Sequence, residues 1–179
     1  MNERKKILAI SGSTRNNSAN HNIIAAIAKL YSDRLEFESL NTLSQLPYFN
    51  PDIDNENVPA VVASFRNKIA SADGILICTP EYVFSLPGIL KNALEWTVST
   101  TIFLKKPAAL ITASALGNTA HESLLLIMKT IGAKFDDSTT LLIQGARSKI
   151  DSDGKFRDKE TLSLIDNLML SFSNILDME

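Results

Sequence analysis

The sequence is short of the residues and patterns that define several common protein classes. It has one cysteine, Cys78, so no disulfide can form within the chain, and we expect a reducing, cytoplasmic compartment. No apolar run approaches the length of a membrane span, and too few apolar residues follow the charged start for a signal peptide. The formal net charge of −2 at pH 7 provides no field that would gather nucleic acid or anionic membranes. We therefore expect small-molecule chemistry, with no nucleic-acid and no membrane partner.

Candidates for nucleophilic or metal chemistry are equally scarce. Cys78 ends an apolar run and has no histidine near it in sequence, so we expect it to pack in the core. His21 and His121 lack carboxylate partners, and we expect both to be structural or peripheral, with no metal site. The stretch 52–54 (Asp-Ile-Asp) is like the opening of a calcium loop, but the glycine and final glutamate of such a loop are missing. We interpret it as solvated turn residues.

Neither of two common phosphate-binding signatures is present. The sequence contains no G-x-x-x-x-G-K-[ST] and no G-x-G-x-x-G, which argues against nucleoside triphosphate chemistry. Residues 7–20 instead read as a buried strand, a small polar turn and a helix start. Backbone N–H groups at that helix start, together with Ser13, Ser18 and Asn20, make a site into which a phosphate fits. The alternative is that Ser18 merely caps the helix and the serines merely fill a turn.

The length of 179 residues is enough for one compact domain and too short for two, so we expect a single domain over residues 1–179. The content of 45% apolar and 21% charged residues is ordinary for globular proteins and argues against disorder. Strands are expected at 7–10, 35–40, 74–78, 107–112 and 139–144, and helices at 23–31, 58–72, 89–96, 124–131 and 162–176. The alternation predicts a three-layer α/β fold with a five-stranded parallel sheet in the order 2-1-3-4-5, in which residues 35–40 form a margin. Thr119 and Glu122 have capping-box spacing ahead of the fourth helix.

Three loops are expected to converge on one site. In this strand order ligands bind beyond the carboxyl ends of the first, third and fourth strands, which are followed by residues 11–20, 79–88 and 113–118. The long irregular stretch 41–57 is expected to be functional or to cover something. Helix 124–131 is apolar nearly all round, so we expect it to be buried both on the sheet and on a partner subunit. Trp96 and Met128 are expected in the core or in a subunit interface.

Three motifs resemble those of the NADPH-dependent FMN reductase family of flavodoxin-like proteins. They are Gly12-Ser13-x-Arg15-x-x-Ser18-x-Asn20, Pro80-Glu81-Tyr82, and the run Ser85-Leu86-Pro87-Gly88-Ile89-Leu90-Lys91-Asn92-Ala93-Leu94-Glu95-Trp96. The resemblance covers most of the chain in order. It implies the flavodoxin-like fold, FMN held without a covalent bond, NADPH or NADH as electron donor, and a homodimer or homotetramer.

The resemblance also implies a set of cofactor-binding residues. Ser13, Arg15, Ser18 and Asn20 would hold the FMN phosphate, the loop at 80–82 would lie against the flavin ring, and Ser114 with Gly117 would close its pyrimidine side. Two stretches depart from the family pattern. Val83 and Phe84 stand where many members carry asparagine and a small or polar residue, and Leu116-Gly117-Asn118 replaces a glycine-richer turn. The expected cofactor-binding set is Ser13, Arg15, Ser18, Ala19, Asn20, Pro80, Glu81, Tyr82, Val83, Phe84, Ser114 and Gly117. No catalytic side chain is expected, since the flavin carries the chemistry.

The function implied is an oxidoreductase that passes a hydride from NAD(P)H to bound FMN and then electrons to a quinone, free flavin, azo dye or metal ion. Arg15 has a second possible partner, the 2′-phosphate of NADPH. Two other functions remain open. One is a flavin-binding electron carrier or redox sensor that acts through a protein partner; the other is a flavodoxin-like module that has lost its flavin.

Overall fold

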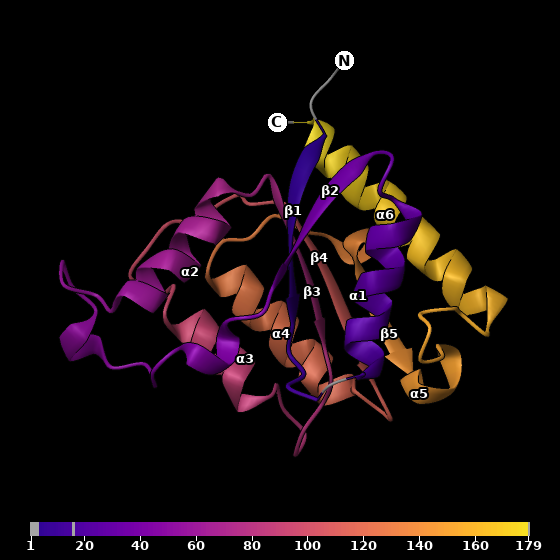
Figure 1. Ribbon diagram of the computed structural model, residues 1–179, viewed down its shortest axis with the longest axis horizontal. Coiled ribbons are helices and arrows are strands. Elements are labelled where there is room, and N and C mark those ends of the chain that lie inside the picture. The colour runs from indigo at the N-terminus through magenta and orange to yellow at the C-terminus, as the bar shows by residue number, and fades with distance from the viewer. Residues whose placement is uncertain (1–3, 16, 179) are drawn as a thin grey trace.

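The fold is a five-stranded parallel sheet between two layers of helices, shown by a computed structural model that describes residues 4–15 and 17–178 (Figure 1). The strands are β1 (Lys5–Ser11), β2 (Leu35–Leu40), β3 (Gly74–Thr79), β4 (Ala108–Ser114) and β5 (Thr140–Gln144), and the helices are α1 (Ala19–Leu30), α2 (Ala60–Ser71), α3 (Gly88–Glu95), α4 (Asn118–Thr130), α5 (Ala146–Lys149) and α6 (Lys159–Asp177). The sheet order is β2-β1-β3-β4-β5, and every neighbouring pair is parallel. The predicted fold class and strand order are confirmed.

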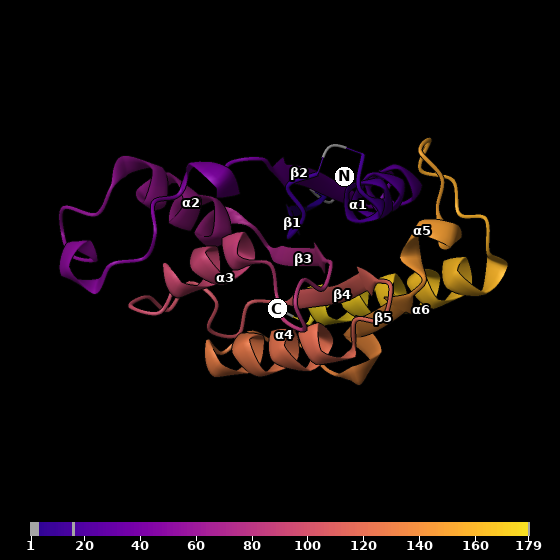
Figure 2. The ribbon, with the colours of Figure 1, turned by 90° about the horizontal axis from the view of Figure 1, so that it is seen from below.

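Each face of the sheet has its own apolar cluster, which explains the uninterrupted apolar strands. Within β1, Ile7 and Ala9 pack against α1 and α6, whereas Leu8 and Ile10 pack in the cluster that includes α2, α3 and α4. Figure 2 shows these two helical layers on opposite sides of the sheet. A strand buried on both faces has no polar side, so its sequence does not alternate. No helix in the described part of the chain is long and apolar enough to cross a membrane.

One helix was not predicted, and one expectation about another helix is met in part. The structure has a short helix, α5, that the sequence pattern did not predict, since four residues are too few to show a helical period. Helix α4 buries Leu124 and Met128 on the sheet, but Leu126 is 65% exposed. This exposed apolar side chain leaves a face for the partner subunit, so burial of this helix on a partner stays a prediction.

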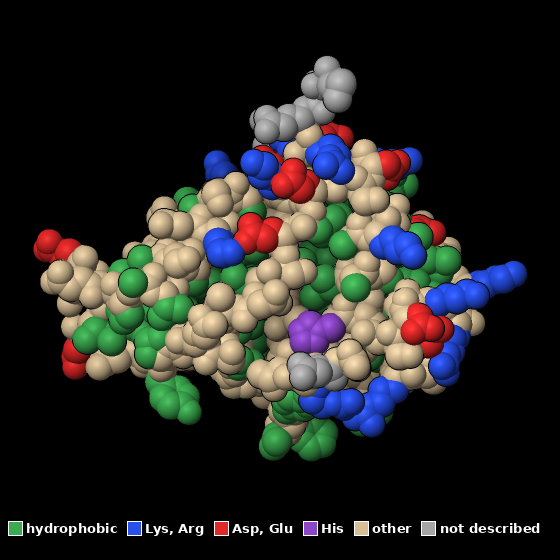
Figure 3. Space-filling model, in the orientation of Figure 1, with side chains coloured by type: hydrophobic (Ala, Val, Ile, Leu, Met, Phe, Trp, Pro, Cys, Tyr) green, Lys and Arg blue, Asp and Glu red, His purple; other side chains and the backbone are tan. Residues whose placement is uncertain are grey.

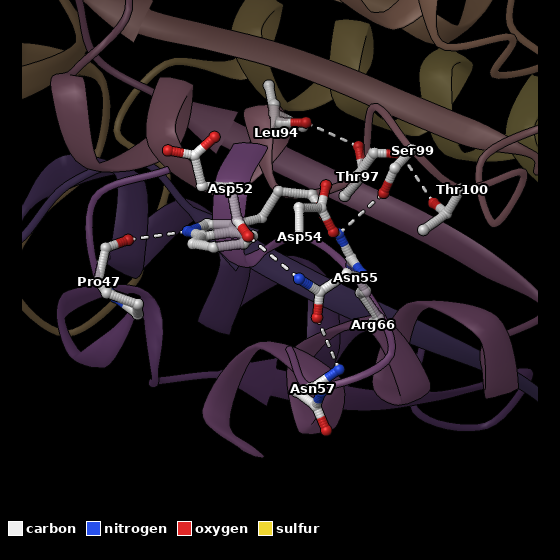
Figure 4. A network of polar contacts seen from close by, with 11 residues as sticks. Pro47, Asp52, Asp54, Asn55, Asn57, Arg66, Leu94, Thr97, Ser99 and Thr100 are labelled. Atoms are coloured by element: carbon white, nitrogen blue, oxygen red, sulfur yellow. Dashed lines mark hydrogen bonds and ion pairs between the residues drawn. The ribbon is translucent and has the colours of Figure 1, made fainter. Parts of the chain in front are cut away.

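The long segment between β2 and α2 is pinned by a buried ion pair rather than being a solvated turn throughout. Arg66 of α2 donates to the Asp54 carboxylate at 2.6 Å and to the Trp96 carbonyl at 2.7 Å (Figure 4). The side chains of Arg66 and Asp54 are only 14% and 5% exposed. Burial opposes ionisation of Asp54, but hydrogen bonds from Arg66 and Ser99 outweigh it, so the pKa of this carboxyl lies below its usual range. The indole of Trp96 donates to the Pro47 carbonyl at 2.8 Å and fixes the other end of the segment.

Gly12 marks the closest approach between the first turn and a neighbouring strand. Its N–H donates to the Cys78 carbonyl at 2.9 Å. A Cβ placed on Gly12 would lie 2.1 Å from Thr79 Oγ1 and 3.1 Å from Leu90 Cδ2, so no side chain fits there. Glycine is required at this position because β1 and β3 approach closely.

Gly12→Ala is expected to lower the free energy of unfolding by about 1–3 kcal/mol, the usual cost of overpacking a core. Gly88→Ala is the matched control, because a Cβ at Gly88 meets nothing within 4 Å. Urea unfolding of both variants measures the difference. Equal stabilities would show that the contact with Thr79 is not a constraint.

Candidate functional site

A cleft of about 710 Å³ lies at the carboxyl ends of the strands. It is lined by Ser13, Arg15, Asn17, Ser18, Ala19, Asn20, Pro80, Glu81, Tyr82, Ala113, Ser114, Ala115, Gly145, Ala146, Arg147, Ser148 and Ile150. Its volume is within the range of small-molecule sites. The structure thus brings the three predicted loops together and adds a fourth segment, residues 145–150, that follows β5.

The turn between β1 and α1 is held by its own side chains. Ser18 is the N-cap of α1, and its hydroxyl accepts from the His21 N–H at 3.2 Å. The Nδ1 atom of His21 lies 3.1 Å from the Arg15 carbonyl, which fastens the helix to the turn. The Ser13 hydroxyl accepts from the Arg15 N–H at 3.3 Å. Ser18 therefore does cap the helix, and His21 has the structural role that we expected.

The same turn carries hydrogen-bond donors without acceptors. In the first turn of α1, the N–H groups of Ala19 and Asn20 have no acceptor among the described residues, as is usual where a helix begins. The Arg15 guanidinium likewise bonds to no described residue, and Arg15 is exposed. Unpaired N–H groups and a cation at one end of a cleft favour an anion such as a phosphate.

The Asn20 side chain faces the sheet and not open solvent. Its Nδ2 donates to the Ala113 carbonyl at 3.2 Å, and its Oδ1 accepts from the Cys78 thiol at 3.2 Å. This one amide therefore ties α1 to both β3 and β4, and the backbone N–H of Asn20 is left without an acceptor among the described residues. Cys78 is fully buried, and burial raises the pKa of its thiol, which confirms the expected packing role.

Glu81 joins the two loops that were expected near the flavin ring. Its carboxylate accepts from the Gly117 N–H at 3.3 Å and from the Ala120 N–H at 3.0 Å, and its own N–H donates to the Ser114 hydroxyl at 3.2 Å. Gly117 is the N-cap of α4 and has no side chain to offer, so Glu81 caps this helix from another loop. The predicted capping box of Thr119 and Glu122 is wrong, because the cap is a tertiary contact.

The loop after Tyr82 makes a tight, strained turn. Tyr82 and Ser85 exchange two backbone hydrogen bonds of 3.0 and 3.1 Å around Val83 and Phe84, whose φ values are 51° and 55°. This is the left-handed conformation of a two-residue hairpin, which Asn and Gly favour and a β-branched residue resists. Val83 and Phe84 are 95% and 70% exposed, and neither lines the cleft, whereas Tyr82 does.

Some of the other expected residues line the cleft and others do not. Pro80 and Ser114 line the cleft, whereas Gly117 lies buried behind it as the cap of α4. His121 is outside the cleft, with Nδ1 3.0 Å from Thr112 Oγ1, and its half-buried position lowers its pKa. Sequence reasoning missed Arg147 and Ser148, because no motif or helical period marks the segment after β5.

Glu81→Ala is expected to lower the free energy of unfolding by about 1–2 kcal/mol, since two backbone donors lose their acceptor. Glu122→Ala, which removes an exposed carboxylate of the same helix, should change stability by less than about 0.5 kcal/mol. Chemical denaturation of the two variants gives both values. A larger loss of stability for Glu122→Ala than for Glu81→Ala would support the capping box and contradict the structure.

Comparison with known proteins agrees with this geometry. The sequence profile of the NADPH-dependent FMN reductase family matches residues 5–146. A 2-hydroxy-1,4-benzoquinone reductase of a Burkholderia species is 32% identical and covers 92% of both chains, and an NAD(P)H-dependent FMN reductase of Pseudomonas aeruginosa is 32% identical and covers 92% of this chain and 91% of its own. Among solved structures, the NAD(P)H:acceptor oxidoreductase FerB from Paracoccus denitrificans has a TM-score of 0.83 at 26% identity and covers 97% of this chain and 98% of its own.

Proposed function

The chain belongs to the NADPH-dependent FMN reductase family, and we propose that the cleft is its FMN site within one domain of residues 1–179. As a member of this family it is an oxidoreductase that uses FMN and NAD(P)H. The observation that carries the site assignment is a set of donors at one end of the cleft that have no acceptor among the described residues: the Ala19 and Asn20 N–H groups and the Arg15 guanidinium.

The residues present fit the cofactor. A phosphate at the start of α1 would accept hydrogen bonds from Ser13, Ser18, and the free N–H groups of Ala19 and Asn20, while Arg15 supplies charge. The opposite wall, which includes Pro80, Tyr82 and Ser114, offers an aromatic side chain and a hydroxyl for a flat ring. These assignments support the cofactor-binding set expected from the sequence, except that Val83, Phe84 and Gly117 do not line the cleft.

When bound, FMN supplies the hydride chemistry that no side chain provides. The chain's own residues bind and orient it: the turn before α1 fixes one end, and the Glu81 contacts hold the two ring-side loops at a fixed separation. We propose that the electron acceptor is a small molecule and that a quinone is favoured. The Burkholderia relative is named for a benzoquinone, and its match covers nearly the whole chain.

We also propose a homodimer or homotetramer in the cytoplasm. Large apolar side chains are exposed on the described surface, among them Tyr48, Phe84 and Leu126, and hydrophobic groups project from the lower edge in Figure 3. Exposed apolar side chains of this size are the groups that a subunit interface would bury. A monomeric mass by light scattering at micromolar concentration would contradict the oligomer.

The FMN-loaded protein is expected to consume NADPH or NADH continuously when benzoquinone is supplied, at a rate proportional to protein concentration. Absorbance at the nicotinamide band follows the reaction, and protein without FMN is the control. The carrier alternative predicts retained FMN without sustained consumption, and that result would replace the reductase assignment.

Arg15→Ala is expected to weaken FMN binding by about 1.5–3 kcal/mol, roughly ten- to a hundredfold, because a charged contact with the phosphate is lost. Riboflavin, which lacks the phosphate, should bind the variant and the unchanged protein equally. Titration of flavin fluorescence measures both. Unchanged FMN affinity would remove Arg15 from the phosphate site and leave the 2′-phosphate of NADPH as its partner.

A further inference from the structure

The segment after β5 is fixed on one wall of the cleft. The Gly145 N–H donates to the Ala115 carbonyl at 3.1 Å, and the Asn22 amide of α1 donates to the Asp151 carbonyl at 2.8 Å. Between these two ties, Ala146 and Ile150 are buried one helical turn apart. Both ribbon views show α5 beside α1 (Figures 1 and 2). Arg147 is therefore held beside the start of α1 and is not on a loose tail.

The two cationic residues of this segment differ in whether they form an ion pair. Lys149 donates to the Asp158 carboxylate at 2.5 Å, which raises the pKa of Lys149 and lowers that of Asp158 to about 2. Arg147, two residues earlier, is exposed at the cleft and forms no ion pair or hydrogen bond with any described residue. One cation is neutralised within the protein, whereas the other faces the ligand space.

The described lining residues of the cleft carry more positive than negative charge. Glu81 is the one carboxylate among the described lining residues, and both of its oxygens accept from the backbone of α4. Arg15 and Arg147 come from opposite ends of the chain and line the same cleft. Figure 3 shows Lys and Arg side chains gathered along the lower edge of this face, where the carboxyl ends of the strands lie.

We propose that Arg147 is a second phosphate-binding residue, which together with Arg15 holds a phosphate monoester dianion in the cleft. This inference rests on the proposed function and lies outside the family match, which ends at residue 146. One arginine balances half the charge of such a dianion, and two guanidinium groups balance it fully. Two ligands of this enzyme carry the group: FMN at its 5′ position and NADPH at its 2′ position.

The test compares Arg147→Gln with Arg157→Gln, a matched control that removes an exposed arginine outside the cleft. Neither side chain is buried, so both variants should keep the unfolding temperature of the unchanged protein. One arm titrates the flavin-free proteins with FMN and with riboflavin. The other arm measures KM for NADPH and for NADH with FMN at saturation.

Loss of about tenfold or more in FMN affinity for Arg147→Gln alone, with riboflavin unchanged, would support the inference and assign the 5′-phosphate. A similar rise in KM for NADPH but not NADH would support it with the 2′-phosphate. The inference is overturned if Arg147→Gln behaves like Arg157→Gln, or if riboflavin and NADH are weakened as much as their phosphorylated counterparts. If the unchanged protein retains no FMN, the proposed function itself fails.

Discussion

The two hydrogen bonds from the start of α4 to the Glu81 carboxylate decide how the ligand-facing loops sit. A parallel sheet brings the carboxyl ends of its strands to one edge, but it does not fix the loops that follow them. Glu81 links the loop after β3 to the helix after β4, and the Asn20 amide links α1 to both of these strands. With these two side chains in place, three separate loops join the segment 145–150 in forming the walls of one cleft.

The cleft contains hydrogen-bond donors and cationic side chains that bond to no described residue of the protein. Among the described residues, the first N–H groups of α1 and the guanidinium groups of Arg15 and Arg147 have no partner, so they add no internal hydrogen bond or ion pair to the stability of the fold. Elsewhere in the described chain, Arg66 pairs with Asp54 and Lys149 pairs with Asp158. The contrast supports our proposal that the cleft binds an anionic ligand, which agrees with the family to which the chain belongs.

The sequence was sufficient for the sheet and for most of the cleft, because both depend on local patterns. Continuous apolar runs predicted doubly buried strands, and the turn before α1 contains its donors within a few residues. Features that depend on tertiary contacts were not predictable in the same way. Glu81 caps a helix that begins 37 residues further along the chain (118 − 81), and Arg147 reaches the cleft through a helix too short to show a period. Val83 and Phe84 form a two-residue turn with a left-handed backbone, a conformation that such side chains disfavour. The residue types at these positions therefore did not predict the turn.

The most direct test of the account is the visible absorption spectrum of the purified protein after FMN is added and free flavin is removed, followed by NADPH under nitrogen. The account predicts that the protein stays yellow through desalting and that NADPH bleaches it promptly. A colourless protein would contradict the phosphate site at the start of α1, and a yellow protein that NADPH leaves unchanged would contradict the reductase.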